Sequence, residues 1–235
     1  MKIGGFQKYS LIDYPGKVCT IVFTIGCNFR CPFCHNSELV IDKPKEMPIE
    51  IVFEYLEKNK NLLDAVVITG GEPTLQPDLK DFVKKIKELG LLVKVDTNGA
   101  RSDVVKELID KGLVDYIAMD VKAPLEFEKY NKVVGGVLTE EMFESVKNTI
   151  GIIMGSGIDY EFRTTVVPTL HSDEDIVAIA RRIKSAKLYA LQQFIPRNTL
   201  NPSFLKLPST PREKLEELKK KCEEFVENVE VRYEE

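Results

Sequence analysis

The strongest constraint on the fold is the regular alternation of short β-branched runs with longer amphipathic stretches. Six such runs cover residues 18–24, 64–70, 91–97, 114–120, 160–168 and 188–194. Most are nearly continuous in apolar residues, which is typical of strands buried on both faces of a parallel sheet. The sequence therefore predicts six parallel strands.

The stretches between these runs carry apolar residues at helical spacing. Such stripes occur in residues 79–89, 104–109 and 176–183, and a final helix is predicted over residues 215–226. Strands that alternate with helices form right-handed βαβ units. Six units favour an α/β fold in which a parallel sheet with outer helices curves into an open, partial (βα)6 barrel. The segment at 229–233 is expected to add a last strand.

Length and composition point to one domain. The chain has 235 residues and 43% apolar content, enough for one sizeable core. We expect a single domain over residues 1–235, with a metal-binding loop at 25–36 and a C-terminal loop and helix at 196–235 packed on the barrel. A net charge of -4 gives no electrostatic reason to expect nucleic acid or an anionic membrane as a partner.

No segment resembles a signal peptide or a membrane span, so the predicted compartment is the cytoplasm. Structural disulfides are rare there, and the five cysteines are better explained by packing or by metal and redox chemistry. Cys19 lies inside the first run and Cys222 lies on the apolar side of the last helix. Both are predicted to pack in the core.

Cys27, Cys31 and Cys34 form a C-x3-C-x2-C motif in the loop after the first strand. Thiolates at this spacing favour zinc or an iron-sulfur centre. A zinc site that also uses His35 is possible, although adjacent Cys34 and His35 are cramped around one tetrahedral ion. The motif also contains C-x-x-C-H, typical of haem attachment, and a thioredoxin-like C-x-x-C pair.

The remaining interpretation is a 4Fe-4S cluster held by three cysteines. Such a cluster normally takes four thiolates, so three would leave one iron with an open coordination site. A substrate with an amine and a carboxylate could chelate that iron.

Unusual polar residues follow the next three predicted strands. GGEP occupies residues 70–73, DTNG occupies residues 96–99, and Asp120 and Lys122 end the fourth strand. Each alone could be a turn or an ion pair. Because the carboxyl ends of parallel strands meet at one face, we expect all of them and the cysteine loop to line one cavity.

The cysteine motif with Phe33 as its aromatic residue, followed by GGEP, resembles the radical S-adenosylmethionine (SAM) superfamily over essentially the whole chain. The resemblance implies a 4Fe-4S cluster on Cys27, Cys31 and Cys34, with SAM on the open iron. It also implies that Lys122 pairs with the SAM carboxylate and that Gly70 and Gly71 admit its amine. The implied SAM-binding set is Phe33, His35, Asn36, Gly70, Gly71, Glu72, Asn98, Asp120, Lys122 and Gln192, and Asp96, Thr97 and Asp120 resemble a monovalent-cation site.

Other motifs are similar to those of glycyl-radical-enzyme activating enzymes, and most similar to the activators of anaerobic ribonucleoside-triphosphate reductase. They are SLIDYPGK at 10–17, CHN at 34–36, MDVK at 119–122 and VVP at 166–168. The resemblance implies that SAM is cleaved to a 5'-deoxyadenosyl radical, which removes a hydrogen atom from a glycine of a partner glycyl radical enzyme. Asp13 would face the incoming glycine strand, Arg163 would be catalytic, and a flavodoxin or ferredoxin-like protein would donate the electron.

Two features differ from relatives of this kind. Residues 36–63 hold no cysteine, so one cluster is expected, and Gln192, Gln193 and Phe194 stand where pyruvate formate-lyase activases have a histidine. His171 is expected to be solvated. A formate-lyase-type activase, a radical SAM enzyme acting on a small molecule, and a non-catalytic zinc or iron-sulfur module stay open as alternatives.

Overall fold

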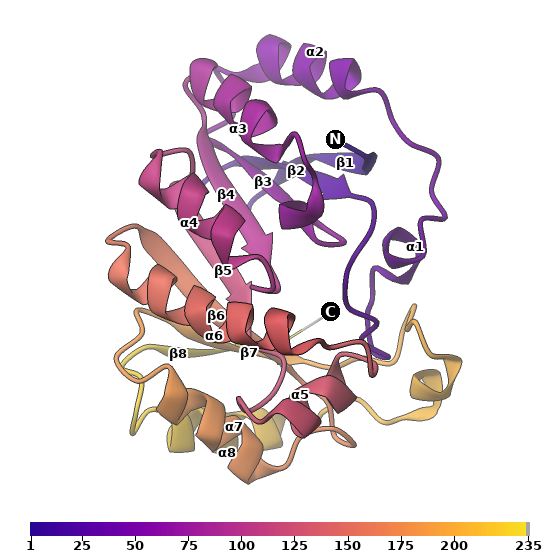
Figure 1. Cartoon of the computed structure of the whole chain (residues 1–235), viewed down its shortest axis with the longest axis vertical. Coiled ribbons are helices and arrows are strands. Elements are labelled where there is room, and N and C mark those ends of the chain that lie inside the picture. The colour runs from indigo at the N-terminus through magenta and orange to yellow at the C-terminus, as the bar shows by residue number, and fades with distance from the viewer. Residues whose placement is uncertain (234–235) are drawn as a thin grey trace.

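The computed structural model describes residues 1–233 and contains one eight-stranded sheet (Figure 1). The strands follow chain order across the sheet, from β1 at one edge to β8 at the other, and β2 to β8 are parallel. Their bounds are β1 (Ile3–Ser10), β2 (Cys19–Thr24), β3 (Ala65–Gly70), β4 (Leu92–Thr97), β5 (Tyr116–Asp120), β6 (Asp159–Val166), β7 (Tyr189–Gln193) and β8 (Val229–Arg232).

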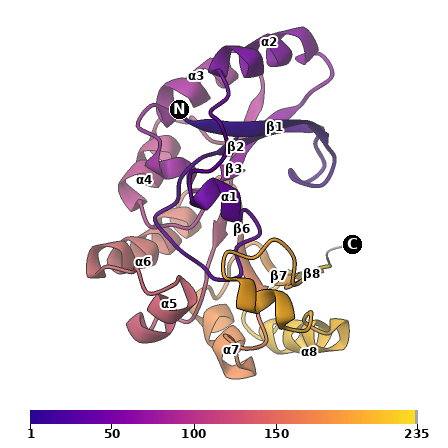
Figure 2. The same ribbon diagram turned by 90° about the vertical axis from the view of Figure 1, so that its right-hand side faces the viewer.

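Helices cover the outer face of this sheet, while its two edges stay apart (Figure 2). The α-helices are α1 (Ser37–Val40), α2 (Ile49–Asn59), α3 (Leu79–Glu88), α4 (Ser102–Asp110), α5 (Phe127–Val133), α6 (Glu140–Gly155), α7 (Asp173–Arg182) and α8 (Arg212–Cys222). Two 3-10 helices, η1 (Pro73–Leu75) and η2 (Pro202–Lys206), lie in loops. The predicted open α/β barrel is therefore confirmed.

One strand departs from the predicted parallel sheet. β1 pairs with β2 in the antiparallel direction, with Ser10 opposite Cys19. Its sequence, IGGFQKYS, contains two glycines and lacks the apolar run that identified the other strands. An edge strand needs only one neighbour, so its pairing outweighs its weak local preference.

Two hydrophobic clusters hold the sheet. The larger one fills the space between the sheet and the outer helices and includes Cys222 at the end of α8. The smaller one lies on the inner face and includes Tyr14, Cys19 and Tyr116. Cys19 and Cys222 are fully buried, which confirms their predicted role in packing.

The loop after β7 is tied to the barrel and to the cysteine loop. Thr210 N donates to Phe194 O at 3.0 Å, and Asn201 N donates to Pro32 O at 2.9 Å. These two hydrogen bonds join the loop after β7 to the end of β7 and to the cysteine loop. No helix in residues 1–233 combines the length and the apolar character needed to cross a membrane.

Candidate active site

A cavity of about 470 Å³ lies on the inner face of the sheet. It reaches from the carboxyl ends of the parallel strands, where the cysteine loop lies, toward their amino ends, where Asp13 lies. Every predicted site residue lines it: Asp13, Cys27, Cys31, Phe33, Cys34, His35, Asn36, Gly70, Gly71, Glu72, Asp96, Thr97, Asn98, Asp120, Lys122, Arg163 and Gln192.

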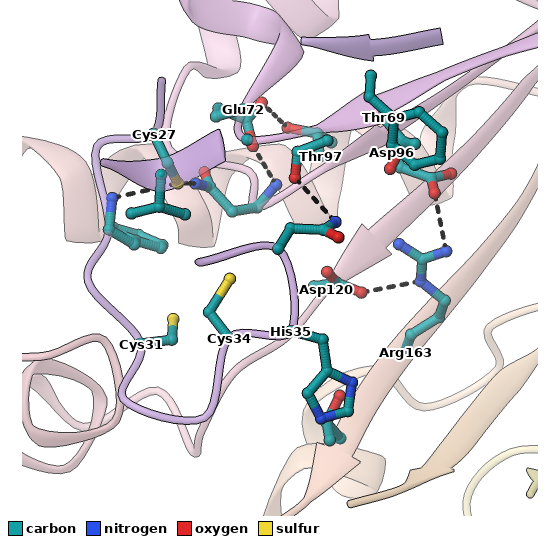
Figure 3. Close-up of a pocket in the computed structure, with 18 of the residues that line it drawn as sticks. Cys27, Cys31, Cys34, His35, Thr69, Glu72, Asp96, Thr97, Asp120 and Arg163 are labelled. Carbon is teal, nitrogen blue, oxygen red and sulfur yellow. Dashed lines mark hydrogen bonds and ion pairs between the residues drawn. The ribbon is translucent and has the colours of Figure 1, made fainter. Parts of the chain in front are cut away.

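The three cysteines of the loop between β2 and α1 face this cavity as free thiols (Figure 3). Burial raises the pKa of Cys27 to about 11 and that of Cys31 to about 12. Burial also raises the pKa of Cys34, although Lys122 opposes this effect. Thiols in this environment stay protonated at neutral pH unless a metal takes the place of the proton.

The donor set fits a cluster with three protein ligands. Cys19 and Cys222 are buried and do not line the cavity, and His35 Nε2 lies 2.9 Å from Ile195 O. Within residues 1–233, no three His, Cys, Asp or Glu side chains are grouped as a site for a single metal ion. Among the described residues, Cys27, Cys31 and Cys34 are the cysteine thiols that line the cavity.

Gly70 and Gly71 allow the end of β3 to touch the cysteine loop. A Cβ on Gly71 would lie 2.0 Å from Gly26 O, and Gly70 has a φ of +112°. Glu72 N donates to Gly26 O at 2.8 Å, which fixes this contact. The glycines therefore serve close backbone packing beneath the cysteines, in addition to the SAM approach implied by the resemblance.

Glu72 joins two strand-end loops through its carboxylate. The side chain is 1% exposed. It accepts hydrogen bonds from Thr97 Oγ1 and Asn98 N, both at 2.7 Å, and from Thr74 N at 3.1 Å (Figure 3). Burial raises its pKa although these hydrogen bonds act in the opposite direction. Its contacts support a structural role, and its predicted contact with SAM stays a prediction.

Arg163 bridges two carboxylates on the inner face of the sheet. Its guanidinium lies 2.8 Å from Asp120 Oδ1 and 3.1 Å from Asp96 Oδ2 (Figure 3). Burial opposes ionisation of Asp120, but Arg163 and Lys122 outweigh it and hold the pKa of Asp120 well below its usual range. The guanidinium thus supplies positive charge between Asp96 and Asp120, and the monovalent cation implied by the resemblance stays a prediction.

Lys122 carries a positive charge beside the cysteines. Its Nζ lies 2.9 Å from Asp120 Oδ2. Burial alone would lower its pKa, but the Asp120 carboxylate outweighs burial and raises it above the usual lysine range. The ammonium is therefore available for a carboxylate bound in the cavity.

His171 was expected to be solvated, and the structure shows that this is wrong. The ring is buried, its Nδ1 accepts from Val167 N at 3.0 Å, and its Nε2 lies 2.8 Å from Lys122 O. Burial lowers its pKa, so the neutral ring donates from Nε2 to this carbonyl. His171 thereby ties the loop after β6 to the backbone of Lys122. Its sequence position in a loop gave no sign of this contact.

Several cavity residues were not predicted from the sequence. Most of them lie on strands, where inward-facing positions alternate along each strand, whereas Phe29 and Arg197 lie in loops. On β6, Arg163 was predicted, but Thr165 two positions later, which also lines the cavity, was not. On β2, Ile21 and Phe23 line the cavity with the same spacing of two. The missed lining residues include Gln7, Ile21, Phe23, Phe29, Thr69, Thr165 and Arg197.

The profile of the Radical SAM superfamily matches residues 21–183, which span the sheet from β2 to β6 and all three cysteines. The chain belongs to the radical SAM superfamily. A radical SAM enzyme uses a 4Fe-4S cluster and SAM, and three thiols that face one cavity are a donor set that would leave one iron of such a cluster open. This family membership also rejects the haem and thioredoxin-like interpretations of the cysteines.

Over nearly its whole length, this radical SAM protein is similar in sequence to proteins named as activating enzymes of glycyl radical enzymes. It is 39% identical over 235 residues to a protein of Methanocaldococcus jannaschii provisionally named a glycyl-radical enzyme activating enzyme, covering 98% of this chain and 95% of the relative. It is 29% identical to the pyruvate formate-lyase-activating enzyme of Clostridium pasteurianum, covering 85% and 83% of the two chains. The protein is therefore a radical SAM enzyme of the glycyl-radical-activating type.

A solved structure supports the fold of this radical SAM enzyme. SuiB of Streptococcus suis, bound to SAM, matches with a TM-score of 0.67 at 15% identity, covering 92% of this chain and 50% of that one. At this identity the likeness concerns the fold alone.

We expect Lys122→Met to weaken SAM binding by about tenfold to a hundredfold, because an ammonium that pairs a buried carboxylate contributes roughly 1.5–3 kcal/mol. Iron content should not change, since Lys122 is no cluster ligand. Anaerobic calorimetry with SAM and an iron assay measure the two effects. Exposed Lys84→Met on α3 is the matched control. Loss of iron with unchanged SAM affinity would show that Lys122 supports the cluster loop instead.

Proposed function

We propose that this radical SAM activase generates the glycyl radical of an anaerobic ribonucleoside-triphosphate reductase. The single observation that carries the activase part is the full-length similarity to glycyl-radical activating enzymes. The reductase as target rests on the sequence resemblance, including Gln192, Gln193 and Phe194 at the end of β7. Gln192 of this stretch lines the cavity that would hold the cofactors.

The cavity residues would have different roles in such an enzyme. Cys27, Cys31 and Cys34 would hold the cluster, and Lys122 would receive the SAM carboxylate. When bound, the cluster and SAM supply one-electron chemistry that ends in a 5'-deoxyadenosyl radical. Arg163 keeps Asp96 and Asp120 paired and so fixes the inner faces of β4 and β5 beside the cofactors. In this proposal the electron comes from a flavodoxin or ferredoxin-like protein.

The shape of the site favours a polypeptide substrate over a small molecule. The cavity of about 470 Å³ would have to hold both the cluster and SAM, so a substrate would approach from its open side. The sheet is open between β1 and β8 (Figure 2). Asp13 lies in the loop that leads into the amino end of β2, whereas the cysteines follow its carboxyl end. An extended glycine strand can enter through this open side and reach the cofactors.

Anaerobic electron paramagnetic resonance tests the proposed function. The reconstituted protein, SAM and a reductant are incubated with the anaerobic ribonucleoside-triphosphate reductase of the same organism, and a glycyl doublet is expected. Pyruvate formate-lyase of a fermenting bacterium is the comparison substrate. A doublet on formate-lyase alone would replace the proposed target. SAM cleavage without a doublet on any glycyl radical enzyme would instead indicate a small-molecule substrate.

A further inference from the structure

The loop between β1 and β2 places two large aliphatic side chains in water. Leu11 is 73% exposed and Ile12 is 90% exposed, the highest values among the large apolar side chains in residues 1–233. Single exposed apolar residues are ordinary on protein surfaces. An adjacent pair at the tip of a loop is different, because one partner can cover both side chains at once.

The tip is held in place from inside the barrel. Ser10 Oγ accepts hydrogen bonds from Ile12 N at 3.2 Å and Asp13 N at 3.3 Å. Buried Lys94 donates from Nζ to Asp13 O at 2.5 Å. Tyr14 is buried and its ring centroid lies 5.4 Å from that of Tyr116. A loop with these internal contacts keeps Leu11 and Ile12 outward instead of folding them onto the protein.

Lys94 is itself fixed by the inner face of the sheet. Its Nζ lies 3.7 Å from Asp96 Oδ1 and 3.6 Å from Glu161 Oε1, and 5.2 Å from the Tyr116 ring centroid. The position of the exposed tip is thereby coupled to the same strand that carries Asp96 into the cavity. The tip is a pre-arranged surface, and docking against it costs little conformational entropy.

The tip is continuous with the active-site cavity. Asp13 directly follows Ile12 in the chain and lines the cavity, as does Gln7 of the edge strand β1. Figure 2 shows this loop curling out from the end of β1 on the open side of the sheet. A polypeptide that covers Leu11 and Ile12 therefore lies next to Asp13, which lines the cavity. The occupant that this continuity favours is the macromolecule whose backbone enters the cavity.

We propose that Leu11 and Ile12 form a docking tip that inserts into an apolar depression on the glycyl radical enzyme and aligns its glycine strand with the cavity. This docking site rests on the proposed function, because it needs a polypeptide substrate. Burying two aliphatic side chains at an interface accounts for at least a tenfold gain in affinity. The tip acts in binding and not in chemistry.

The test uses the double variant Leu11→Ser/Ile12→Ser in the full, reconstituted enzyme. We expect the KM for the glycyl radical enzyme to rise at least tenfold, while kcat at saturating partner stays within about twofold. Formation of 5'-deoxyadenosine from SAM and reductant alone should be unchanged. A synthetic peptide that carries only the glycine segment should react equally with both forms, because it lacks the surface that the tip contacts.

The matched control is Ile51→Ser/Leu62→Ser, which removes two exposed aliphatic side chains on and just after α2. It should leave the KM unchanged. An unchanged KM in the docking-tip variant, or an equal rise in the control, overturns the docking proposal. So does loss of self-association or of vesicle binding with no change in KM, since the tip would then contact a second copy or a membrane.

Failure of the proposed function is distinguishable from failure of the docking tip. If the unmodified enzyme cleaves SAM but forms no glycyl radical on any partner, both proposals fall together. If it activates a partner and the docking-tip variant does so with the same KM, only the docking proposal falls.

Discussion

Cys27→Ser is expected to abolish both the iron-sulfur cluster and the cleavage of SAM. The three thiols that line the cavity are the ligands we propose for the cluster, and a hydroxyl is a much weaker ligand for iron than a thiolate. Reconstituted enzyme should hold about four irons per chain, and the variant should hold few or none. Formation of 5'-deoxyadenosine should fall to background.

The position chosen for this substitution separates two chemistries. A thiol oxidoreductase that used Cys31 and Cys34 would keep its disulfide exchange after Cys27→Ser, whereas a cluster enzyme loses its activity. Cys222→Ser on α8 is the matched control, because Cys222 is fully buried and far from the cavity. It should retain iron and activity and lose at most about 1–3 kcal/mol of stability from the buried hydroxyl. Iron content that survived Cys27→Ser would contradict the assignment.

Gly71→Ala is expected to have the second largest effect. The new Cβ would lie 2.0 Å from Gly26 O and 2.7 Å from Gly26 C, and both atoms are backbone. The cysteine loop would have to move away from β3, at a cost of about 1–3 kcal/mol in stability. A displacement of roughly 1 Å at a reacting centre can lower the rate about a hundredfold. We therefore expect a lower melting temperature and at least a hundredfold loss of SAM cleavage.

Gly151→Ala in α6 is the matched control for this substitution. A Cβ on Gly151 meets no atom within 4 Å, and the residue lies in a helix interior. Alanine there should stabilise the protein by roughly 0.5–1 kcal/mol, because glycine is the poorer helix former. Full SAM cleavage by Gly71→Ala would show that the cysteine loop can relax, and would remove the close contact as the reason for glycine at this position.

The sequence by itself determined the six central strands, β8 and four of the outer helices. These elements have clear sequence patterns. Each strand is a run of β-branched and other apolar residues, and each helix has apolar residues at helical spacing over at least one turn. It missed β1, whose glycines weaken any strand signal, and it missed the helices α1, α2, α5 and α6. In β1 the long-range pairing with β2 decides the conformation.

The candidate site was predicted for a related reason. Each motif follows a strand, and parallel strands bring their carboxyl ends together, so cysteines, glycines and Lys122 could be placed on one face from the order of motifs alone. The line of cavity-facing residues along β2 and β6 was largely missed. Alternation within a strand shows which residues share a face, but not whether a cavity lies against that face.

Only the tertiary structure shows which charged side chains form ion pairs and which apolar side chains stay exposed. Arg163 reaches Asp96 from 67 residues away, and Lys94 reaches the Asp13 carbonyl from 81 residues away. His171 is buried and contacts the backbone carbonyl of Lys122 because β5 and β6 are neighbours in the sheet. Local patterns encode secondary structure, whereas burial, ion pairing and the exposed Leu11–Ile12 tip arise from contacts between segments that only the fold brings together.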